Sequence, residues 1–446
     1  MEGDGPKICV VGGGSYTWCP TLLSDVMQTD ELEGAEIALL DINVEAAEAV
    51  RAAAETMAKT LKKTFNVYAT DDEAAAFRHA DFVLITISTG GLKAMTHDLA
   101  IPEKYGIYHT VGDTCGPAGW CRSLRNIPVF AHLSEQIEKS APHAVVLNYT
   151  NPMACLTGTI AAVSSLRHVG LCHGMFGTVR VLQDLFGVEE RDLGIRFGGV
   201  NHFFWVLDFT VKGEPGYPLL AEKLAEKSLD EALREAHVDE HGFAHTDHRV
   251  CDQLYREYGC LPYAGDRHSC EFFPGYLTPD ESRLTPYKLV RTTIEHREDG
   301  FGKCREKVRQ LAAGEIPPFP QSRETAVDIM KALKSNEPFF DVVNLPNIGQ
   351  IDNLPRDAVV ETMGRVDGLG FHPIAVGPLP PAIAVLVKPH CLCQLTTLQA
   401  GLAGERTLAI EALMLDPLCS HLTPSEVRKM GDELMAATRE WLPQFN

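Results

Sequence analysis

The sequence lacks any long hydrophobic run. None of its apolar stretches approaches the ~18 consecutive residues that a transmembrane helix needs, and its 446 residues contain no repeat or low-complexity tract. The start, MEGDGPKICVVGGG, has no basic segment followed by a hydrophobic one, which is the pattern of a secretory signal peptide. We therefore expect a cytoplasmic protein that does not span a membrane.

Positive charge is also scarce. Lysine and arginine together number 40, against 60 aspartates and glutamates, which gives a formal net charge of -20. Such a surface repels nucleic-acid phosphates and anionic lipids, so we expect neither nucleic acid nor a membrane surface as a partner. If the substrate is itself an anion, its pocket must gather arginine or lysine locally against this negative field.

The sequence has no cysteine pattern of a disulfide scaffold. Its 13 cysteines are an odd number and are scattered without close, regular spacing. In a chain of this length, that pattern is typical of free thiols in a reducing compartment.

Hydrophobic strands alternate with helical segments through the first part of the chain. Strand-like runs occur at the start of KICVVGGGSYTW and at 36–42, 81–88, 144–151 and 168–174, and the segment 43–63 is rich in helix formers. This alternation predicts an α/β fold with a doubly wound parallel sheet. After about residue 195 the pattern changes. We therefore expect two domains, 1–195 and 196–446, the second of them mainly α+β.

A glycine-rich turn follows the first strand. In VVGGGS, two glycines occupy the first two positions of the G-x-G-x-x-G dinucleotide motif, and Thr17 replaces the third. Asp41 ends the next strand, where a carboxylate accepts hydrogen bonds from ribose hydroxyls and repels a 2′-phosphate. The pattern favours NAD over NADP, the alternative being a glycine turn in an unrelated α/β domain. The residues expected to contact NAD are Gly12, Gly14, Ser15, Tyr16, Thr17 and Asp41.

A thiol and an imidazole follow two later apolar runs. Cys172 lies in HVGLCHGM, and His202 lies thirty positions further on, in GGVNHFFW. A thiolate with an imidazole suits a first-row divalent ion, although from spacing alone buried core side chains are the commoner outcome. Two other groups, expected to be packed or solvated rather than metal-binding, are His241, His245 and His248, and His390, Cys391 and Cys393.

The motifs form an ordered set that resembles glycoside hydrolase family four. The chain carries, in order, VVGGGS, LLDIN, TGGLKA, IPEKYGI, GDTCGPAG, LRNIPV, NYTNPM, CHGM, GVNHFFW, PNIGQIDNLPRDAVVE and VGPLP, and the resemblance extends from about residue 7 to residue 416. The resemblance implies a Rossmann-like first domain similar to lactate and malate dehydrogenases, which binds NAD. It also implies a second domain that binds substrate and supports oligomerisation, as a homodimer or homotetramer.

The resemblance assigns roles to several residues. Cys172 and His202 fall on the positions that hold a divalent ion, usually Mn²⁺, and Asn151 falls on an asparagine that contacts sugar hydroxyls. Asp266 falls on or near the general base of some members, whereas others use a tyrosine, for which Tyr263 is the candidate. His173 lies where some members have a catalytic acid.

The sequence Cys-His-Gly at 172–174 resembles the branch that cleaves α-uronides, the α-galacturonidases and α-glucuronidases. Family members oxidise C3 of the sugar with NAD, remove the C2 proton, eliminate the leaving group, add water and return the hydride, with no net redox change. A uronate needs a cation, and Arg267 and Arg291 are candidates. The alternatives are an α-glucosidase or α-galactosidase of the same family, and a plain dehydrogenase of the lactate/malate type.

Overall fold

One twelve-stranded sheet runs through the molecule, as a computed structural model of residues 5–172, 174–236, 247–278 and 285–445 describes it. Its first part is parallel, in the order β3-β2-β1-β4-β5-β6. This is the strand order of dinucleotide-binding dehydrogenases, so the predicted doubly wound, Rossmann-like α/β fold is confirmed. The strands are β1 (Lys7–Val11), β2 (Glu36–Leu40), β3 (Asn66–Thr70), β4 (Phe82–Ile85), β5 (Val145–Asn148) and β6 (Arg167–Gly170).

The parallel strands are hydrophobic on both faces because helices cover both. Alternate residues of β1 enter different clusters: Ile8 and Val10 pack with α1 (Cys19–Gln28) and α2 (Val44–Leu61), whereas Cys9 and Val11 pack with α5 (Gly116–Ser140) and α6 (Met153–Val163). Side chains of a strand point alternately to its two sides. A strand covered on both sides therefore needs an unbroken apolar run, which the sequence provides.

The second half of the chain extends the same sheet with antiparallel strands. β10 joins β6 through the pair Asn344 and Gly170, and β11 joins β7 through the pair Glu361 and Gly199. The added strands are β7 (Leu193–Val200), β8 (Phe203–Val211), β9 (Glu214–Pro215), β10 (Phe339–Pro346), β11 (Val359–Asp367) and β12 (Gly370–Pro373). The predicted boundary at residue 195 thus falls inside β7.

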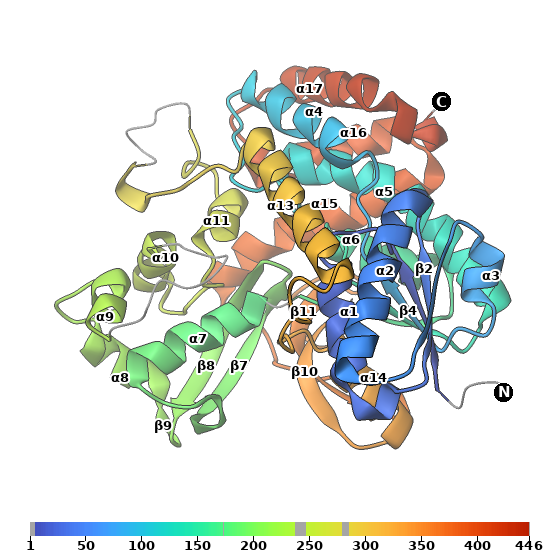
Figure 1. Cartoon of the computed structure of the whole chain (residues 1–446). Helices are drawn as coiled ribbons and strands as arrows, with labels where there is room; N and C mark the ends of the chain where they lie inside the picture. Colours follow the sequence, from blue (N-terminus) through green and yellow to red (C-terminus); the bar gives the residue numbers. More distant parts are fainter. Residues whose placement is uncertain (1–4, 173, 237–246, 279–284, 446) are drawn as a thin grey trace.

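Most of the remaining helices form two groups around the sheet (Figure 1). Helices α7 to α10 lie with β7, β8 and β9, whereas α4 and α15 to α17 gather near α5. No helix among the described residues has the length and hydrophobicity to cross a bilayer. The helices are α3 (Glu73–Phe77), α4 (Gly91–Glu103), α7 (Gly174–Phe186), α8 (Gly216–Lys223), α9 (Leu229–Glu235), α10 (Arg249–Tyr258), α11 (Asp266–Ser269), α13 (Ile294–Ala312), α14 (Ala326–Ser335), α15 (Pro381–Ala403), α16 (Arg406–Met414) and α17 (Pro424–Ala437).

Four predicted strands end earlier than the sequence indicates. The strands expected at 36–42, 81–88, 144–151 and 168–174 end at Leu40, Ile85, Asn148 and Gly170. Asp41, Asn151 and Cys172 therefore lie in loops just beyond the carboxyl ends of parallel strands. All three loops lie at the sheet edge where α/β proteins bind ligands.

The buried carboxyl group of Asp341 gives the fold a pH dependence. Burial raises the pKa of Asp341 to about 6, above the ~3.9 of an unfolded aspartate. The folded state therefore holds the Asp341 proton more tightly than the unfolded state does. Proton binding at Asp341 stabilises the fold fully below about pH 4, and this contribution is lost as the pH rises through about 6. Between these pH values, the unfolding free energy of the wild type should fall by about 2–3 kcal/mol relative to that of Asp341→Asn. Urea unfolding of both proteins measures this difference, and parallel pH profiles would contradict it.

Candidate active site

The structure brings Cys172 and His202 together. Cys172 follows β6, and His202 lies in the two-residue turn between β7 and β8, where Val200 pairs with Phe203. The Sγ of Cys172 lies 3.4 Å from Nε2 of His202. His202 has a φ of +63°, a conformation that costs a non-glycine residue ~1–3 kcal/mol and that is often found at functional sites.

A short chain of hydrogen bonds sets the tautomer of His202. The hydroxyl of Thr114 donates to Oδ1 of Asp113 over 2.7 Å and lies 2.9 Å from Nδ1 of His202. Because a hydroxyl has a single hydrogen, Thr114 accepts from Nδ1–H of His202. The lone pair of Nε2 is therefore directed toward the Cys172 sulfur, and a metal-binding histidine is oriented in this way by its second nitrogen.

Asp113 and His268 complete a cluster of ligand-type atoms. Asp113, His202 and His268 each place such an atom within 4.8 Å of the others, and the rings of His202 and His268 stack with centroids 3.8 Å apart. Within the described ranges, the buried Nδ1 of His268 has no hydrogen-bond partner. Asp113 lies in the GDTCGPAG motif and His268 lies two residues after Asp266, but nothing in their sequence positions indicates that they meet, which only the fold shows.

The donor set fits a first-row divalent cation. Asp113, His202 and His268 offer a carboxylate and imidazole nitrogens, and Cys172, which is not part of this three-residue group, adds its sulfur through the contact with His202. Donors of these types suit Mn²⁺ through Zn²⁺. Burial, and then the Glu361 carboxylate, raises the pKa of the Cys172 thiol well above its ordinary value. Burial also acts to raise the pKa of Asp113, but His268, His202 and Arg122 outweigh it and hold that pKa below its usual range. Cation binding at Cys172 would therefore release the thiol proton.

Asn151 lies beside this cluster. Its Nδ2 lies 3.4 Å from Oδ2 of Asp113, and its backbone oxygen accepts a 2.9 Å hydrogen bond from Nε of Arg122. The buried Oδ1 of Asn151 has no hydrogen-bond partner in the described part of the chain. An unfilled amide oxygen at this position is an acceptor for a hydroxyl group of a ligand.

The two candidate bases have different surroundings. The Tyr263 ring lies 5.8 Å from the His202 ring, and burial, followed by Cys172, raises the pKa of the phenol well above its ordinary value. The carboxyl oxygens of Asp266 instead accept 3.0 Å hydrogen bonds from the backbone N–H groups of Val250 and Cys251, in the first turn of α10. Burial raises the pKa of Asp266 to about 6. Asp266 thus caps a helix, whereas Tyr263 faces the thiol–imidazole pair.

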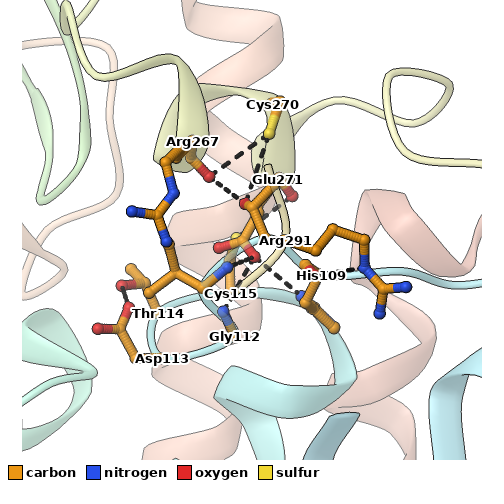
Figure 2. Close-up of polar contacts among 12 residues, drawn as sticks. His109, Gly112, Asp113, Thr114, Cys115, Arg267, Cys270, Glu271 and Arg291 are labelled. Carbon is orange, nitrogen blue, oxygen red and sulfur yellow. Dashed lines mark hydrogen bonds and ion pairs between the residues drawn. The ribbon is translucent and has the colours of Figure 1, made fainter. Parts of the chain in front are cut away.

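The two arginines predicted to bind substrate also have different surroundings. Arg291 pairs with Glu103 and lies over the Tyr108 ring, 4.9 Å from its centroid. Figure 2 shows Arg267 extending on the side of Asp113 and Thr114, whereas the guanidinium of Arg291 points to the opposite side, beyond His109. The site role predicted for Arg291 stays a prediction, and Arg267 is nearer the cluster.

The glycine turn is shaped for close backbone approach. Gly12 has a φ of +92°, and a Cβ placed there would lie 2.2 Å from the carbonyl oxygen of Thr86. Asp41 accepts hydrogen bonds from the backbone N–H groups of Gly14, at 2.9 Å, and Asn43, at 2.8 Å. The carboxylate therefore lies against the turn, as the dinucleotide motif requires.

The departure at Thr17 has a physical reason. The hydroxyl of Ser15 accepts from the backbone N–H of Trp18, and α1 begins only at Cys19. The exposed Thr17 and the half-buried Tyr16 therefore precede the helix. The third glycine of the motif allows close packing of helix on strand, and Thr17 lies outside that contact.

The other candidate ligands form no second cluster among the described residues. His390 is buried and donates from Nε2 to the backbone oxygen of Phe272, and His248 contacts the backbone oxygen of Ala264. All thirteen cysteines, including Cys391 and Cys393, are free thiols. Three histidines named above, His173, His241 and His245, lie outside the described residues.

Comparisons with known proteins agree along nearly the whole chain. The chain is 33% identical over 454 residues to an α-galacturonidase of Thermoanaerobacter italicus, covering 98% of each, and 30% identical to an α-galactosidase of Bacillus subtilis, covering 98% of this chain and 99% of the relative. The structure of Bacillus subtilis lplD, at 31% identity, matches with a TM-score of 0.85 over 96% of this chain and 99% of that one.

A more distant structure shares the fold alone. It is a 6-phospho-α-glucosidase from gut microorganisms, in complex with NAD and Mn²⁺, with 22% identity and a TM-score of 0.82 over 99% of this chain and 100% of that one.

The family model described as "Family 4 glycosyl hydrolase" matches residues 7–188, and the model of that family's C-terminal domain matches residues 197–419. This chain therefore belongs to family 4 of the glycosyl hydrolases.

Proposed function

We propose that the protein hydrolyses α-uronides, with α-galacturonides first among them, and that it uses NAD⁺ and a divalent cation such as Mn²⁺. The observation that carries this proposal is the contact between Cys172 and His202 at the sheet edge that also holds the Asp41 turn. It is supported by the 33% identical α-galacturonidase and by the Cys-His-Gly sequence at 172–174.

The cation would be held by Cys172 and His202, and the dinucleotide by the turn around Gly12 and Gly14. When bound, NAD⁺ reversibly accepts a hydride from C3, and the cation acts as a Lewis acid on the neighbouring sugar oxygens, so that the C2 proton becomes acidic. The chain's own groups then orient the sugar and move its protons.

Tyr263 is the group that we assign to the C2 proton. Its ring faces His202; burial, followed by Cys172, raises the pKa of the phenol, and Arg267 only partly opposes this rise. Asn151, whose Nδ2 lies 3.4 Å from Oδ2 of Asp113, would offer its unfilled Oδ1 to a sugar hydroxyl. Loss of the C2 proton leads to elimination of the C1 substituent. Water then adds at C1 and a proton returns to C2, and return of the hydride to C3 completes hydrolysis with no net redox change.

An α-galactosidase is the second candidate, because a relative with that name is 30% identical over nearly the full chain. A plain lactate/malate-type dehydrogenase is disfavoured, because such an enzyme has no use for the Cys172–His202 pair. Hydrolysis without net NADH formation separates the glycosidases from the dehydrogenase.

The test is a substrate panel with NAD⁺, Mn²⁺ and a thiol reductant present. Nitrophenyl α-galacturonide and α-glucuronide are compared with the neutral α-galactoside and α-glucoside. We expect kcat/KM for the preferred uronide to exceed that for its neutral counterpart by at least ~10-fold, the value of one charge-assisted hydrogen bond. Equal rates on the two classes would contradict the uronide proposal.

The carboxylate of Asp41 should decide between the two dinucleotides. We expect the wild type to bind NAD⁺ at least ~10-fold more tightly than NADP⁺, since the carboxylate repels a 2′-phosphate. Asp41→Ser should weaken NAD⁺ binding and remove most of this preference. Calorimetric titration with both dinucleotides measures the ratio, and an unchanged ratio in the variant would contradict the role of Asp41.

A further inference from the structure

Two arginines beside the site have an unused buried donor. The Nε groups of Arg267, in α11, and Arg297, in α13, are buried and have no hydrogen-bond partner in the part of the chain that the structure describes. Each guanidinium is anchored elsewhere: one nitrogen of Arg267 donates to the Thr292 hydroxyl, and Nη2 of Arg297 donates to the Val111 oxygen over 2.7 Å. Buried donors are nearly always paired, so these two call for an acceptor.

The two guanidinium groups lie near the candidate metal-binding residues. Arg267 directly precedes His268, and Arg297 holds Val111, two residues before Asp113. The segments are joined, because the Thr292 N–H donates to the Thr110 oxygen over 2.9 Å. Figure 2 shows Arg267 on the side of Asp113.

The local charge favours an incoming anion. Burial lowers the pKa of Arg297. The Asp113 carboxylate opposes this shift, whereas the nearby charge of Arg267 adds to it. Glu271 is the other carboxylate that acts on Arg297. Its Oε1 accepts from the N–H groups of Val111, at 2.8 Å, and Gly112, at 2.9 Å, whereas its buried Oε2 has no hydrogen-bond partner among the described residues. Two neighbouring cations in a chain of net charge -20 mark a place where an anionic ligand is attracted.

We propose that Arg297, with Arg267 beside it, binds the carboxylate of the uronide, and that Arg297 is the residue that selects uronides over neutral hexosides. This inference rests on the proposed function and adds the specificity-determining residue. A carboxylate has two oxygens and accepts from two donors at once, which matches the two unfilled Nε groups. Arg291 is less suited to this role because it is already paired with Glu103.

The test compares Arg297→Gln with Arg305→Gln, which removes the same charge from an exposed position on the same helix. For nitrophenyl α-galacturonide, we expect kcat/KM of Arg297→Gln to fall by about 10- to 100-fold, the value of a charged hydrogen bond. The rate on nitrophenyl α-galactoside should change by less than ~3-fold, well under the value of one hydrogen bond, and Arg305→Gln should match the wild type on both substrates.

A binding measurement separates specificity from folding. Calorimetric titration of the NAD⁺- and Mn²⁺-loaded protein with D-galacturonate should show at least ~10-fold weaker binding in Arg297→Gln, with D-galactose unaffected. If Arg297→Gln does not fold, Arg297→Lys keeps the charge but lacks the planar fork, and the same selective loss is expected.

The two possible failures are distinct. A wild type without preference for uronides overturns the proposed function, and this inference falls with it. If the wild type prefers uronides but the Arg297 variant keeps this preference, only the role of Arg297 is overturned. The same holds if the variant loses activity on both substrates equally.

Discussion

Replacing Cys172 with serine is expected to abolish metal-dependent turnover while leaving NAD⁺ binding nearly unchanged. The sulfur lies 3.4 Å from Nε2 of His202, and the serine hydroxyl is a poor anionic ligand at neutral pH. Loss of Lewis-acid stabilisation of several kcal/mol corresponds to a fall in kcat of at least ~1,000-fold. Steady-state kinetics with added Mn²⁺ and titration with NAD⁺ measure the two effects.

Cys304→Ser is the matched control, because Cys304 is a half-buried free thiol on α13. This variant should keep wild-type activity and metal dependence. Mn²⁺-dependent turnover that survives in Cys172→Ser would show that the cation is held elsewhere.

Tyr263→Phe should give the second large effect. The phenyl ring keeps the packing against Phe204, with centroids 5.4 Å apart, so the fold should be retained. Loss of a proton-transfer group lowers kcat by about 100- to 10,000-fold. In the wild type, deuterium at C2 of the substrate should slow turnover if removal of this proton limits the rate.

Asp266→Asn separates the two candidate bases. Because Asp266 accepts from two backbone N–H groups of α10, this change should lower the free energy of unfolding by about 1–2 kcal/mol, as loss of a helix cap does. Denaturant unfolding measures the effect. If Asp266→Asn lost all activity at unchanged stability, while Tyr263→Phe remained active, the assignment of the base would be reversed.

The parallel half of the fold could be predicted from the sequence because the patterns that indicate its strands and helices are local. Each buried strand is an apolar run, and the helix expected at 43–63 forms as Val44–Leu61, capped by the Asn43 side chain. The insertion of β10 and β11 between β6 and β7 could not be predicted. It depends on a contact between Asn344 and Gly170, which are far apart in the sequence and carry no local signal.

The candidate site was predictable only in part, for the same reason. Cys172 and His202 stood out as ligand types after apolar runs, and the fold places them in contact. Asp113, His268 and Arg297 belong to separate loops and helices, and only the tertiary structure shows that they converge. The predicted homodimer or homotetramer also depends on surfaces that meet only in the folded protein, and it stays a prediction.

The most direct test of the central claim is a crystal structure of the protein with NAD⁺ and Mn²⁺, with anomalous data collected at the manganese edge. A single strong peak is expected within bonding distance of the sulfur of Cys172 and of Nε2 of His202, beside the nicotinamide ring. A peak bound by other residues, or a fully loaded and active enzyme with these two atoms unliganded, would contradict the account.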